Sequence, residues 1–335
     1  MSRQTRVAVV GGGSWGTTVA SLVSRNAPTL LWTRRADVAE EIERDHVNSQ
    51  YLPDEELDHN LRATCDLQEA TESADVLVMA VPSHGFRDVL AQAAPYIRPW
   101  VPIISLTKGL EQETHNRMTQ VIEDLLPQHP AGVLAGPNLA REVIGGYAAA
   151  AVLALPDERV TTALQRLFTR TVFRVYAGTD VVGVEIAGAL KNVFAISAGM
   201  AAGLGTGDNT RALVISRSLA EMARLGVAMG GERHTFAGLA GIGDLLATCI
   251  SPLSRNRHVG EELARGRTID EITQEMTMVA EGVKSSRAVM ELAERYGVDM
   301  PIAREVYLVV NEGHTAEEAF RGLLRTRPTT ELAAN

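Results

Sequence analysis

Two lysines occupy positions where a side chain could take part in chemistry. Lys191 lies within residues 181–204, a segment otherwise rich in Ala, Gly, Val and Ile. In a cleft, loss of solvent would lower the pKa of its ammonium group and let it exchange a proton with an alcohol near neutral pH. Otherwise its aliphatic stem carries the charge to the surface. Lys108 follows a predicted strand at the edge where parallel sheets bind ligands, which favours a functional lysine over a surface one.

The segment Ser254-Arg255-Asn256-Arg257 is suited to bind a phosphate. We expect it to begin a helix with Ser254 as the N-cap. Hydroxyl, guanidinium, amide and main-chain N–H groups would then converge on one anion, although a solvated basic helix start has the same composition. The Gly-rich run 238–244 before it indicates a close approach of main chains that directs Asp244 toward a polar group.

Gly136-Pro137-Asn138 follows another predicted strand. Its main chain and amide are suited to hydrogen-bond a small polar ligand. A simple turn has the same composition, and the sequence favours neither interpretation.

The N-terminal segment contains a dinucleotide-binding pattern. A short apolar strand, residues 7–10, is followed by Gly11-x-Gly13-x-x-Gly16 and by a helix-compatible stretch. Gly11 permits the tight turn, Gly13 lets a pyrophosphate approach the main chain, and Gly16 lets the helix pack against the strand. The helix start adds unpaired N–H groups and a positive dipole end. The order of strand, turn and helix therefore predicts dinucleotide binding.

Arg34 and Arg35 follow the second predicted strand, where an acidic residue normally accepts the ribose 2′-hydroxyl of NAD. Guanidinium groups suit a 2′-phosphate instead, so the pair favours NADP(H), with NAD(H) still possible. Stacking of an arginine on adenine is the alternative, and it would not discriminate between the two.

The composition limits the class of protein. The 335 residues are 45% hydrophobic and 22% charged, as in ordinary globular proteins, and the net charge of −9 argues against binding to nucleic acid or an anionic membrane. We expect no signal peptide and a cytoplasmic protein. Residues 181–204 are expected to form a buried core helix, because each central charge costs about 3 kcal/mol in a bilayer.

The sequence shows no pattern of a metal site. There is no HExxH motif and no dense cluster of His, Cys and carboxylates, so no metal is expected. Cys65 and Cys249 lie far apart and are interpreted as reduced thiols.

Alternating strand and helix patterns fill the first half of the chain. Such alternation predicts right-handed βαβ units and a parallel sheet. Strands are expected at 7–10, 29–33, 76–81, 102–106, 133–135 and 148–155, and helices at 36–45, 83–94 and 116–126. Later segments have helical periodicity, at 181–204, 211–225, 286–296 and 302–310. We therefore predict a doubly wound Rossmann-type α/β domain over residues 1–180 and an all-helical substrate-binding and catalytic domain over 181–335.

Motifs along most of the chain resemble the bacterial-type NAD(P)-dependent glycerol-3-phosphate dehydrogenases. They are Gly-Gly-Gly-Ser-Trp-Gly-Thr (11–17), Ala-Val-Pro-Ser (80–83), Thr-Lys-Gly-Leu-Glu (107–111), Ala-Gly-Pro-Asn-Leu-Ala (135–140), Ala-Leu-Lys-Asn-Val (189–193), Gly-Ile-Gly-Asp-Leu (241–245), Ser-Arg-Asn-Arg (254–257) and Val-Ala-Glu-Gly (279–282). The resemblance implies interconversion of sn-glycerol 3-phosphate and dihydroxyacetone phosphate, a supply of glycerol 3-phosphate for phospholipid synthesis, and a homodimer.

By the same resemblance, residues take specific roles. Lys191 is the general acid/base. The substrate site comprises Lys108, Gly136, Asn138, Lys191, Asp244, Ser254, Arg255 and Asn256. The dinucleotide site comprises Gly11, Gly13, Ser14, Trp15, Gly16, Arg34, Arg35, Lys108, Ala140, Arg255, Val279 and Glu281. Two positions depart from the family: Gly12 stands where Ala is common, and Asn138 stands where Ser or Thr is usual.

Two other functions fit parts of the sequence. A β-hydroxyacid or 6-phosphogluconate-type dehydrogenase shares the domain pattern and a catalytic lysine, but its substrates carry a carboxylate. A non-catalytic dinucleotide-sensing module would need the glycine turn but no proton donor. Lys108, Lys191 and Asp244 together argue against the sensor.

Overall fold

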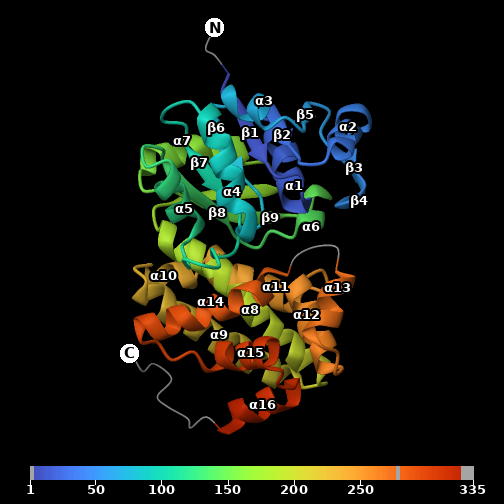
Figure 1. Cartoon of the computed structure of the whole chain (residues 1–335), viewed down its shortest axis with the longest axis vertical. Coiled ribbons are helices and arrows are strands. Elements are labelled where there is room, and N and C mark those ends of the chain that lie inside the picture. The colour runs from blue at the N-terminus through green and yellow to red at the C-terminus, as the bar shows by residue number, and fades with distance from the viewer. Residues whose placement is uncertain (1–3, 277–279, 326–335) are drawn as a thin grey trace. The chain divides into compact units, whose positions relative to one another are not determined.

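The computed structural model describes residues 4–276 and 280–325, and the chain divides into two units (Figure 1). The first unit comprises the chain up to Thr107 together with Asn116–Val181. The second comprises Lys108–His115 and the chain from Val182 onward. The sequence-based division at residue 180 did not separate Lys108–His115 from the first unit. This segment belongs to the second because Leu110 is buried in that unit's core and His115 contacts Glu291.

An eight-stranded sheet forms the centre of the first unit, in the order β10-β9-β8-β7-β6-β1-β2-β5. The strands are β1 (Val7–Val10), β2 (Thr29–Trp32), β5 (Leu61–Thr64), β6 (Val76–Met79), β7 (Ile103–Ser105), β8 (Ala131–Ala135), β9 (Ala149–Ala154) and β10 (Phe173–Gly178). β1 pairs in parallel with both β2 and β6, so the direction of strand succession reverses at β1. Ligands of doubly wound sheets bind outside the carboxyl ends of the strands at such a switch point.

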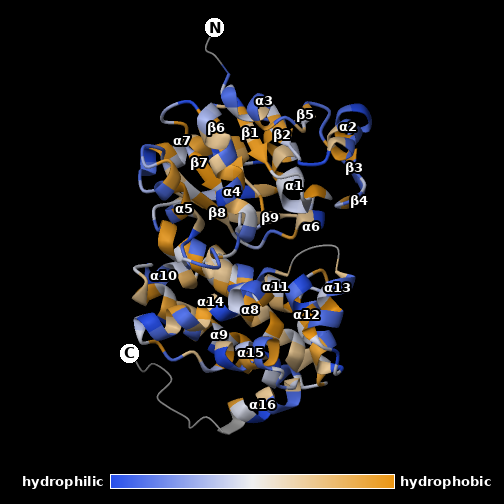
Figure 2. Ribbon diagram, in the orientation of Figure 1, coloured by the Kyte–Doolittle hydropathy of each residue, from blue (hydrophilic) through white to orange (hydrophobic). Residues whose placement is uncertain are grey.

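Helices cover both faces of this sheet. Alternate residues of β1 enter different cores: Val7 and Val9 lie in one, Ala8 and Val10 in the other. The first core includes residues of α1 (Ser14–Ser24), α2 (Ala36–Asp45) and α7 (Glu158–Phe168), and the second includes residues of α3 (Leu67–Glu72), α4 (Ser83–Ala93) and α5 (Met118–Leu125). Strands buried on both faces read as continuous apolar runs, and they are orange in Figure 2. The predicted α/β fold is confirmed.

One strand prediction needs correction. Residues 148–155 were expected in the parallel sheet, but β9 pairs antiparallel with β8. The connection contains only α6 (Ala140–Ile144), whose five residues are too short to carry the chain back along a strand. β5, β10 and an antiparallel hairpin of β3 (Val47–Asn48) and β4 (Leu52–Glu56) were not predicted.

Apart from Lys108–His115, the described part of the second unit consists mainly of helices. Its elements are α8 (Val181–Gly203), α9 (Asp208–Ala228), α10 (Arg233–Phe236), the π-helical turn η2 (Leu239–Gly243), α11 (Asp244–Ile250), α12 (Arg255–Ala264), α13 (Ile269–Glu275), α14 (Glu281–Tyr296), α15 (Pro301–Glu312) and α16 (Ala316–Arg325). α8 is long and apolar enough to cross a membrane by length and composition, but 94% of its most apolar window is buried within the protein. The predicted core helix is therefore confirmed.

Helices α8 and α12 cross at two glycines. A Cβ atom on Gly199 would lie 2.0 Å from the carbonyl oxygen of Arg257, and one on Gly260 would lie 2.0 Å from that of Ile196. Only glycine permits main chains to approach this closely. The crossing brings the start of α12 beside the polar residues of α8.

Candidate active site

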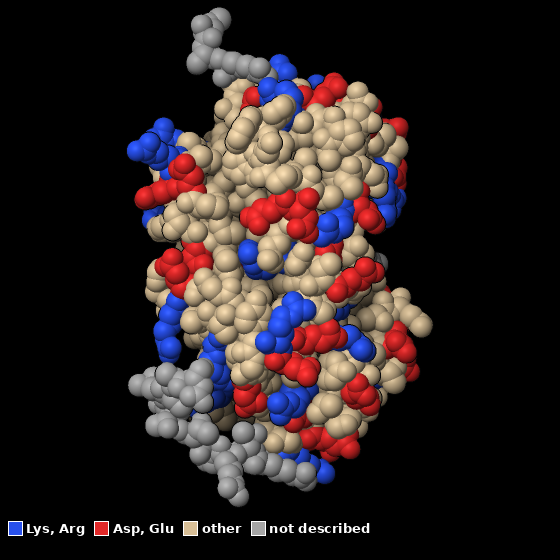
Figure 3. All heavy atoms as spheres, turned by 60° about the vertical axis from the view of Figure 1, so that its left-hand side comes forward, with Lys and Arg blue, Asp and Glu red and all other residues tan. Residues whose placement is uncertain are grey.

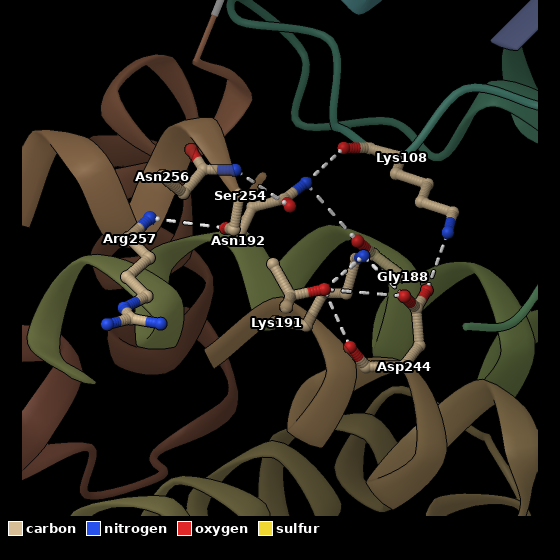
Figure 4. Close-up of polar contacts among 9 residues, drawn as sticks. Lys108, Gly188, Lys191, Asn192, Asp244, Ser254, Asn256 and Arg257 are labelled. Atoms are coloured by element: carbon tan, nitrogen blue, oxygen red, sulfur yellow. Dashed lines mark hydrogen bonds and ion pairs between the residues drawn. The ribbon is translucent and has the colours of Figure 1, made fainter. Parts of the chain in front are cut away.

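A buried aspartate joins two lysines in the second unit. Asp244 is the first residue of α11 and is 1% exposed. Its Oδ1 accepts a hydrogen bond from Nζ of Lys191 at 2.5 Å, and its Oδ2 accepts one from Nζ of Lys108 at 2.7 Å (Figure 4). The preceding turn η2 ends at Gly243, so the Gly-rich run directs this carboxylate as expected. We call Lys108, Lys191 and Asp244 the lysine–aspartate cluster.

Burial tunes Lys191 for proton transfer. Loss of solvent lowers the pKa of its ammonium group from 10.5 to about 8; the carboxylate of Asp244 opposes this shift and the charge of Lys108 adds to it. Nζ also donates to Oγ1 of Thr248 at 2.7 Å. A group with a pKa near the working pH can both give and take a proton. Lys191 therefore has the lowered pKa that its position in an apolar helix predicted.

The cluster is a local cation in an acidic chain. Two ammonium groups and one carboxylate leave a surplus of one positive charge, whereas the whole chain has a net charge of −9. On the face shown in Figure 3, acidic and basic side chains are interspersed. An anionic ligand thus gains more from the buried cluster than from this mixed surface.

A chain of amides connects the cluster to α12 and α14. Nδ2 of Asn192 donates to the carbonyl oxygen of Lys108 (2.9 Å), and Nδ2 of Asn256 donates to Oδ1 of Asn192 (3.0 Å). The main-chain N–H of Gly282 donates to Oδ1 of Asn256 (3.0 Å). Asn256 was expected at a phosphate, and its hydrogen bond with Asn192 was not predicted. These buried amides fix the main chain of Lys108 and the start of α14.

The predicted N-cap of α12 is present. Oγ of Ser254 accepts a hydrogen bond from the main-chain N–H of Arg257 at 3.2 Å (Figure 4). Arg255 is exposed at the first position of the helix, while Ser254 and Asn256 are buried. Glu281 is half-buried at the first position of α14, and Val279 lies outside the described residues.

The glycine turn lies between β1 and α1 in the first unit. Gly11 has a φ of +127°, and a Cβ atom there would lie 2.6 Å from the carbonyl oxygen of Ala80. A Cβ atom on Gly16 would lie 2.0 Å from the carbonyl oxygen of Gly11, whereas one on Gly13 would meet nothing within 4 Å. Gly13 is the N-cap of α1, so no side chain at this position accepts a hydrogen bond from the first N–H groups of the helix. The turn has the close packing and the open cradle that the motif predicted.

Three further predicted cofactor contacts lie in or beside this turn. Trp15 packs edge-on against Phe173, with ring centroids 6.1 Å apart, so its indole belongs to the core of the first unit. Ala140 begins α6, and its carbonyl oxygen lies 3.4 Å from Oγ1 of Thr18 in α1. Ser14 is the first residue of α1 and is half-buried. These residues are gathered at the start of α1.

Two arginines follow β2. Arg34 and Arg35 are both exposed. Arg35 pairs through Nε and Nη2 with the carboxylate of Asp37, at the start of α2. A 2′-phosphate would therefore compete with Asp37 for this guanidinium group.

The loop after β8 uses its own polar groups. Gly136 has a φ of +153°, and a Cβ atom there would lie 2.8 Å from the carbonyl oxygen of Ala150. The side-chain amide of Asn138 faces the carbonyl oxygens of Ala150 and Pro137, both at 3.1 Å; because carbonyl oxygens only accept, the amide nitrogen is assigned to this side, where it donates to both. Its donors are thus engaged within the first unit.

The structure assembles the predicted residues as two sets, one in each unit. Lys108, Lys191, Asp244, Ser254, Arg255, Asn256 and Glu281 lie in the second unit, and the glycine-turn residues, the two arginines, Gly136, Asn138 and Ala140 lie in the first. Sequence reasoning missed Thr248, although its spacing of four from Asp244 places both on one helix face. The rarity of lysine was a further signal, because the chain has three lysines and two of them bind Asp244.

Comparisons with known proteins point to one family. Residues 6–161 and 180–321 match the N-terminal and C-terminal parts of the family described as NAD-dependent glycerol-3-phosphate dehydrogenase. A glycerol-3-phosphate dehydrogenase (NAD(P)+) of Mycobacterium bovis is 60% identical over 331 residues, 98% of this chain and 97% of that protein. One from Sphingopyxis alaskensis is 61% identical over 321 residues, 96% of each chain. The crystal structure of a glycerol-3-phosphate dehydrogenase from Coxiella burnetii superposes with a TM-score of 0.92 at 34% identity, covering 96% of this chain and 99% of that one.

Proposed function

The chain belongs to the family of NAD-dependent glycerol-3-phosphate dehydrogenases, and on this premise we propose that it interconverts sn-glycerol 3-phosphate and dihydroxyacetone phosphate. The single observation that carries the proposal is the lysine–aspartate cluster, in which a buried lysine with a pKa of about 8 is held beside a second cation. A non-catalytic dinucleotide sensor has no use for such a proton donor.

The residues of the glycine turn fit a nicotinamide dinucleotide. Gly13 leaves an open cradle, and the first turn of α1 carries no acidic residue that would repel a phosphate. The main-chain N–H groups at Ser14 and Trp15, together with Gly11, Gly16 and Ala140, would hold the pyrophosphate. When bound, the nicotinamide supplies or accepts a hydride at C2 of the substrate.

Lys191 moves the proton. In the reductive direction its ammonium group protonates the oxygen that develops negative charge at C2, and it is left as a neutral amine that takes a proton from solvent. In the oxidative direction the amine removes the proton from the C2 hydroxyl. Asp244 orients Lys191, and Lys108 adds a second positive charge that stabilises the developing alkoxide.

The start of α12 anchors the other end of the substrate. Ser254, Arg255 and Asn256 present polar groups at a helix N-terminus, where an anion is favoured. Binding energy from this non-reacting phosphate would position C2 at Lys191. We place Gly136 and Asn138 in the substrate site on the resemblance alone, because the donors of Asn138 are engaged by main-chain carbonyls. Val279, Glu281 and a second contact from Arg255 belong to the dinucleotide site on the same basis.

NADP(H) is the favoured cofactor in this proposal, although the relatives' names cover both dinucleotides. The support is the exposed pair Arg34 and Arg35 after β2, where no acidic residue stands to bind a ribose 2′-hydroxyl. Release of Arg35 from Asp37 would free its guanidinium group for the 2′-phosphate.

The physiological setting is also part of the proposal. A cytoplasmic homodimer that supplies glycerol 3-phosphate for glycerophospholipid synthesis is the setting implied by the family resemblance. Light scattering of the purified protein would test the dimer. Growth of a depleted strain with and without added glycerol 3-phosphate would test the supply role.

One assay separates the candidate functions. Oxidation of NADPH and of NADH is followed by absorbance with dihydroxyacetone phosphate or with a 3-keto acid. Oxidation with dihydroxyacetone phosphate alone is the expected result. Oxidation with only the 3-keto acid would indicate a β-hydroxyacid dehydrogenase, and dinucleotide binding without oxidation would indicate a sensor.

A further inference from the structure

Asn48 is a buried amide that contacts the glycine turn. It lies in β3 and is 0% exposed. Its Nδ2 donates to the carbonyl oxygen of Gly12 (3.0 Å) and to Oγ1 of Thr17 (2.9 Å). Gly12 lies in the turn itself, and Thr17 lies in the first turn of α1. One side chain therefore connects both arms of the turn.

The orientation of this amide follows from its partners. A carbonyl oxygen only accepts hydrogen bonds, so the atom of Asn48 that faces Gly12 is the nitrogen. Its Oδ1 is buried, and within the described part of the chain it has no hydrogen-bond partner. An unpaired buried acceptor is unfavourable, so packing alone would favour an apolar residue here. The two donated hydrogen bonds are what distinguish asparagine from leucine at this position.

The β3–β4 hairpin holds Asn48 in place. Asn48 is opposite Leu52 in the antiparallel pair. Leu52 and Leu57 are buried in the core that also contains residues of α1, and the main-chain N–H of Leu57 donates to the carbonyl oxygen of His46 (2.8 Å). The hairpin is thus anchored on both sides of the residue that contacts the turn.

The glycine turn is confined on the opposite side as well. A Cβ atom on Gly12 would lie 2.6 Å from Cβ of Thr33, the buried residue after β2. The carbonyl oxygen of Gly12 carries a partial negative charge that would repel a neighbouring anion. Because this oxygen accepts a hydrogen bond from Asn48, that repulsion is reduced. This arrangement fixes the main chain that precedes the N–H groups of α1.

We propose that Asn48 is a positioning residue for the pyrophosphate of the cofactor. It acts through Gly12 and Thr17, and it holds the glycine turn in the conformation that presents the first N–H groups of α1. This inference rests on the proposed use of the turn for NAD(P)(H).

The test compares three variants of the full chain. Asn48→Leu removes both hydrogen bonds at nearly constant volume, and Thr17→Val removes one. Asn26→Leu is the matched control, because Nδ2 of Asn26 also donates to main-chain carbonyls, those of Arg166, Leu167 and Thr169, but past the other end of α1. The dissociation constants for NADPH and NADH are measured by nucleotide fluorescence, with the melting temperature and the steady-state constants alongside.

Asn48→Leu is expected to raise both dissociation constants about tenfold, because the pyrophosphate is common to both dinucleotides. Thr17→Val should change them in the same direction by less. The kcat at saturating cofactor and the KM for dihydroxyacetone phosphate should stay within about twofold of wild type. Asn26→Leu should lower the melting temperature without changing either dissociation constant.

Unchanged dissociation constants in Asn48→Leu would overturn the inference, as would an equal weakening in Asn26→Leu. If Asn48→Leu does not fold, Thr17→Val decides between the same two results. Failure of the wild-type chain to bind either dinucleotide contradicts the proposed function, whereas wild-type binding with no change in the variants contradicts this inference alone.

Discussion

The carboxylate of Asp244 is shared between two lysines: Oδ1 lies 2.5 Å from Nζ of Lys191, and Oδ2 lies 2.7 Å from Nζ of Lys108. Because the charge of Asp244 raises the pKa of Lys191 while burial lowers it more, the ammonium group is held close to its point of ionisation. Arginine could not replace Lys191 with the same effect, since a guanidinium group does not release its proton in proteins.

The pH dependence of the reaction should have opposite signs in the two directions. Reduction requires the ammonium form of Lys191, so kcat/KM for dihydroxyacetone phosphate should fall as pH rises through the pKa of about 8. Oxidation requires the amine, so kcat/KM for glycerol 3-phosphate should rise through the same pH. Initial-rate profiles in both directions check this. A reductive rate that increases above that pH would exclude Lys191 as the proton donor.

In Asp244→Asn, the fall of kcat/KM for dihydroxyacetone phosphate with rising pH should occur at a lower pH. Removing the carboxylate takes away the charge that raises the pKa of Lys191. The midpoint of this fall should therefore shift down by about one to three pH units. The rate of reduction at neutral pH should decrease as a result. Thr248→Val is the comparison, because it removes a neutral hydrogen-bond partner of the same Nζ. The midpoint of the pH profile of Thr248→Val should stay near that of wild type. Equal shifts in the two variants would contradict an electrostatic role for Asp244.

Cofactor preference should depend on the pair Arg35 and Asp37. Arg35→Ala is expected to raise the KM for NADPH about tenfold or more and to leave that for NADH nearly unchanged. Asp37→Asn should lower the KM for NADPH, because it releases the guanidinium group. Arg44→Ala, at the other end of α2, serves as the control. A parallel change in both KM values would instead indicate stacking of Arg35 on adenine.

Glu221 should make the second unit less stable as pH rises. This carboxylate of α9 accepts the N–H groups of Ile302 and Ala303 at the start of α15, and burial raises its pKa from 4.5 to about 7. Between these values the folded state binds more protons than the unfolded state. The contribution of Glu221 to the free energy of unfolding is therefore fully present below pH 4.5 and is lost as pH rises to about 7. The integrated loss is about 3 kcal/mol.

Denaturation of wild type and Glu221→Gln across this pH range measures the effect. The free energy of unfolding of wild type should fall relative to that of the variant as pH rises. Glu318→Gln is the control, because the N–H of Thr315 lowers the pKa of the exposed Glu318, so its contribution to the free energy of unfolding changes below pH 4.5 and should stay nearly constant over this range. A constant difference between wild type and Glu221→Gln would show that Glu221 has an ordinary pKa in the folded state.

Local patterns were sufficient for most of the first unit. The helix expected at 36–45 coincides with α2, and β1 was expected at its observed residues, because apolar spacing and burial agree there. β10 was missed although its residues alternate between buried and exposed, a pattern that the sequence does display. β3 has two residues and β4 is mostly polar, so neither carries a periodic signal.

Pairing across the chain was not predictable from the same patterns. Lys191 and Asp244 are 53 residues apart, and their contact depends on how η2 and α8 pack. Lys108 was grouped with the first domain, since its segment follows β7 without a break in composition. The contact of Asn48 with Gly12 depends on an unpredicted hairpin. Single residues such as Lys191 were recognisable by type, but their partners needed the structure.

The most direct test of the account is the turnover of Lys191→Met with dihydroxyacetone phosphate and NADPH, measured together with the dissociation constant for NADPH. Lys284→Met is the matched control, because it removes the remaining lysine of the chain. The account predicts that Lys191→Met loses at least about a hundredfold in kcat with unchanged NADPH affinity, while Lys284→Met keeps its activity. Near-normal turnover by a folded Lys191→Met would contradict it.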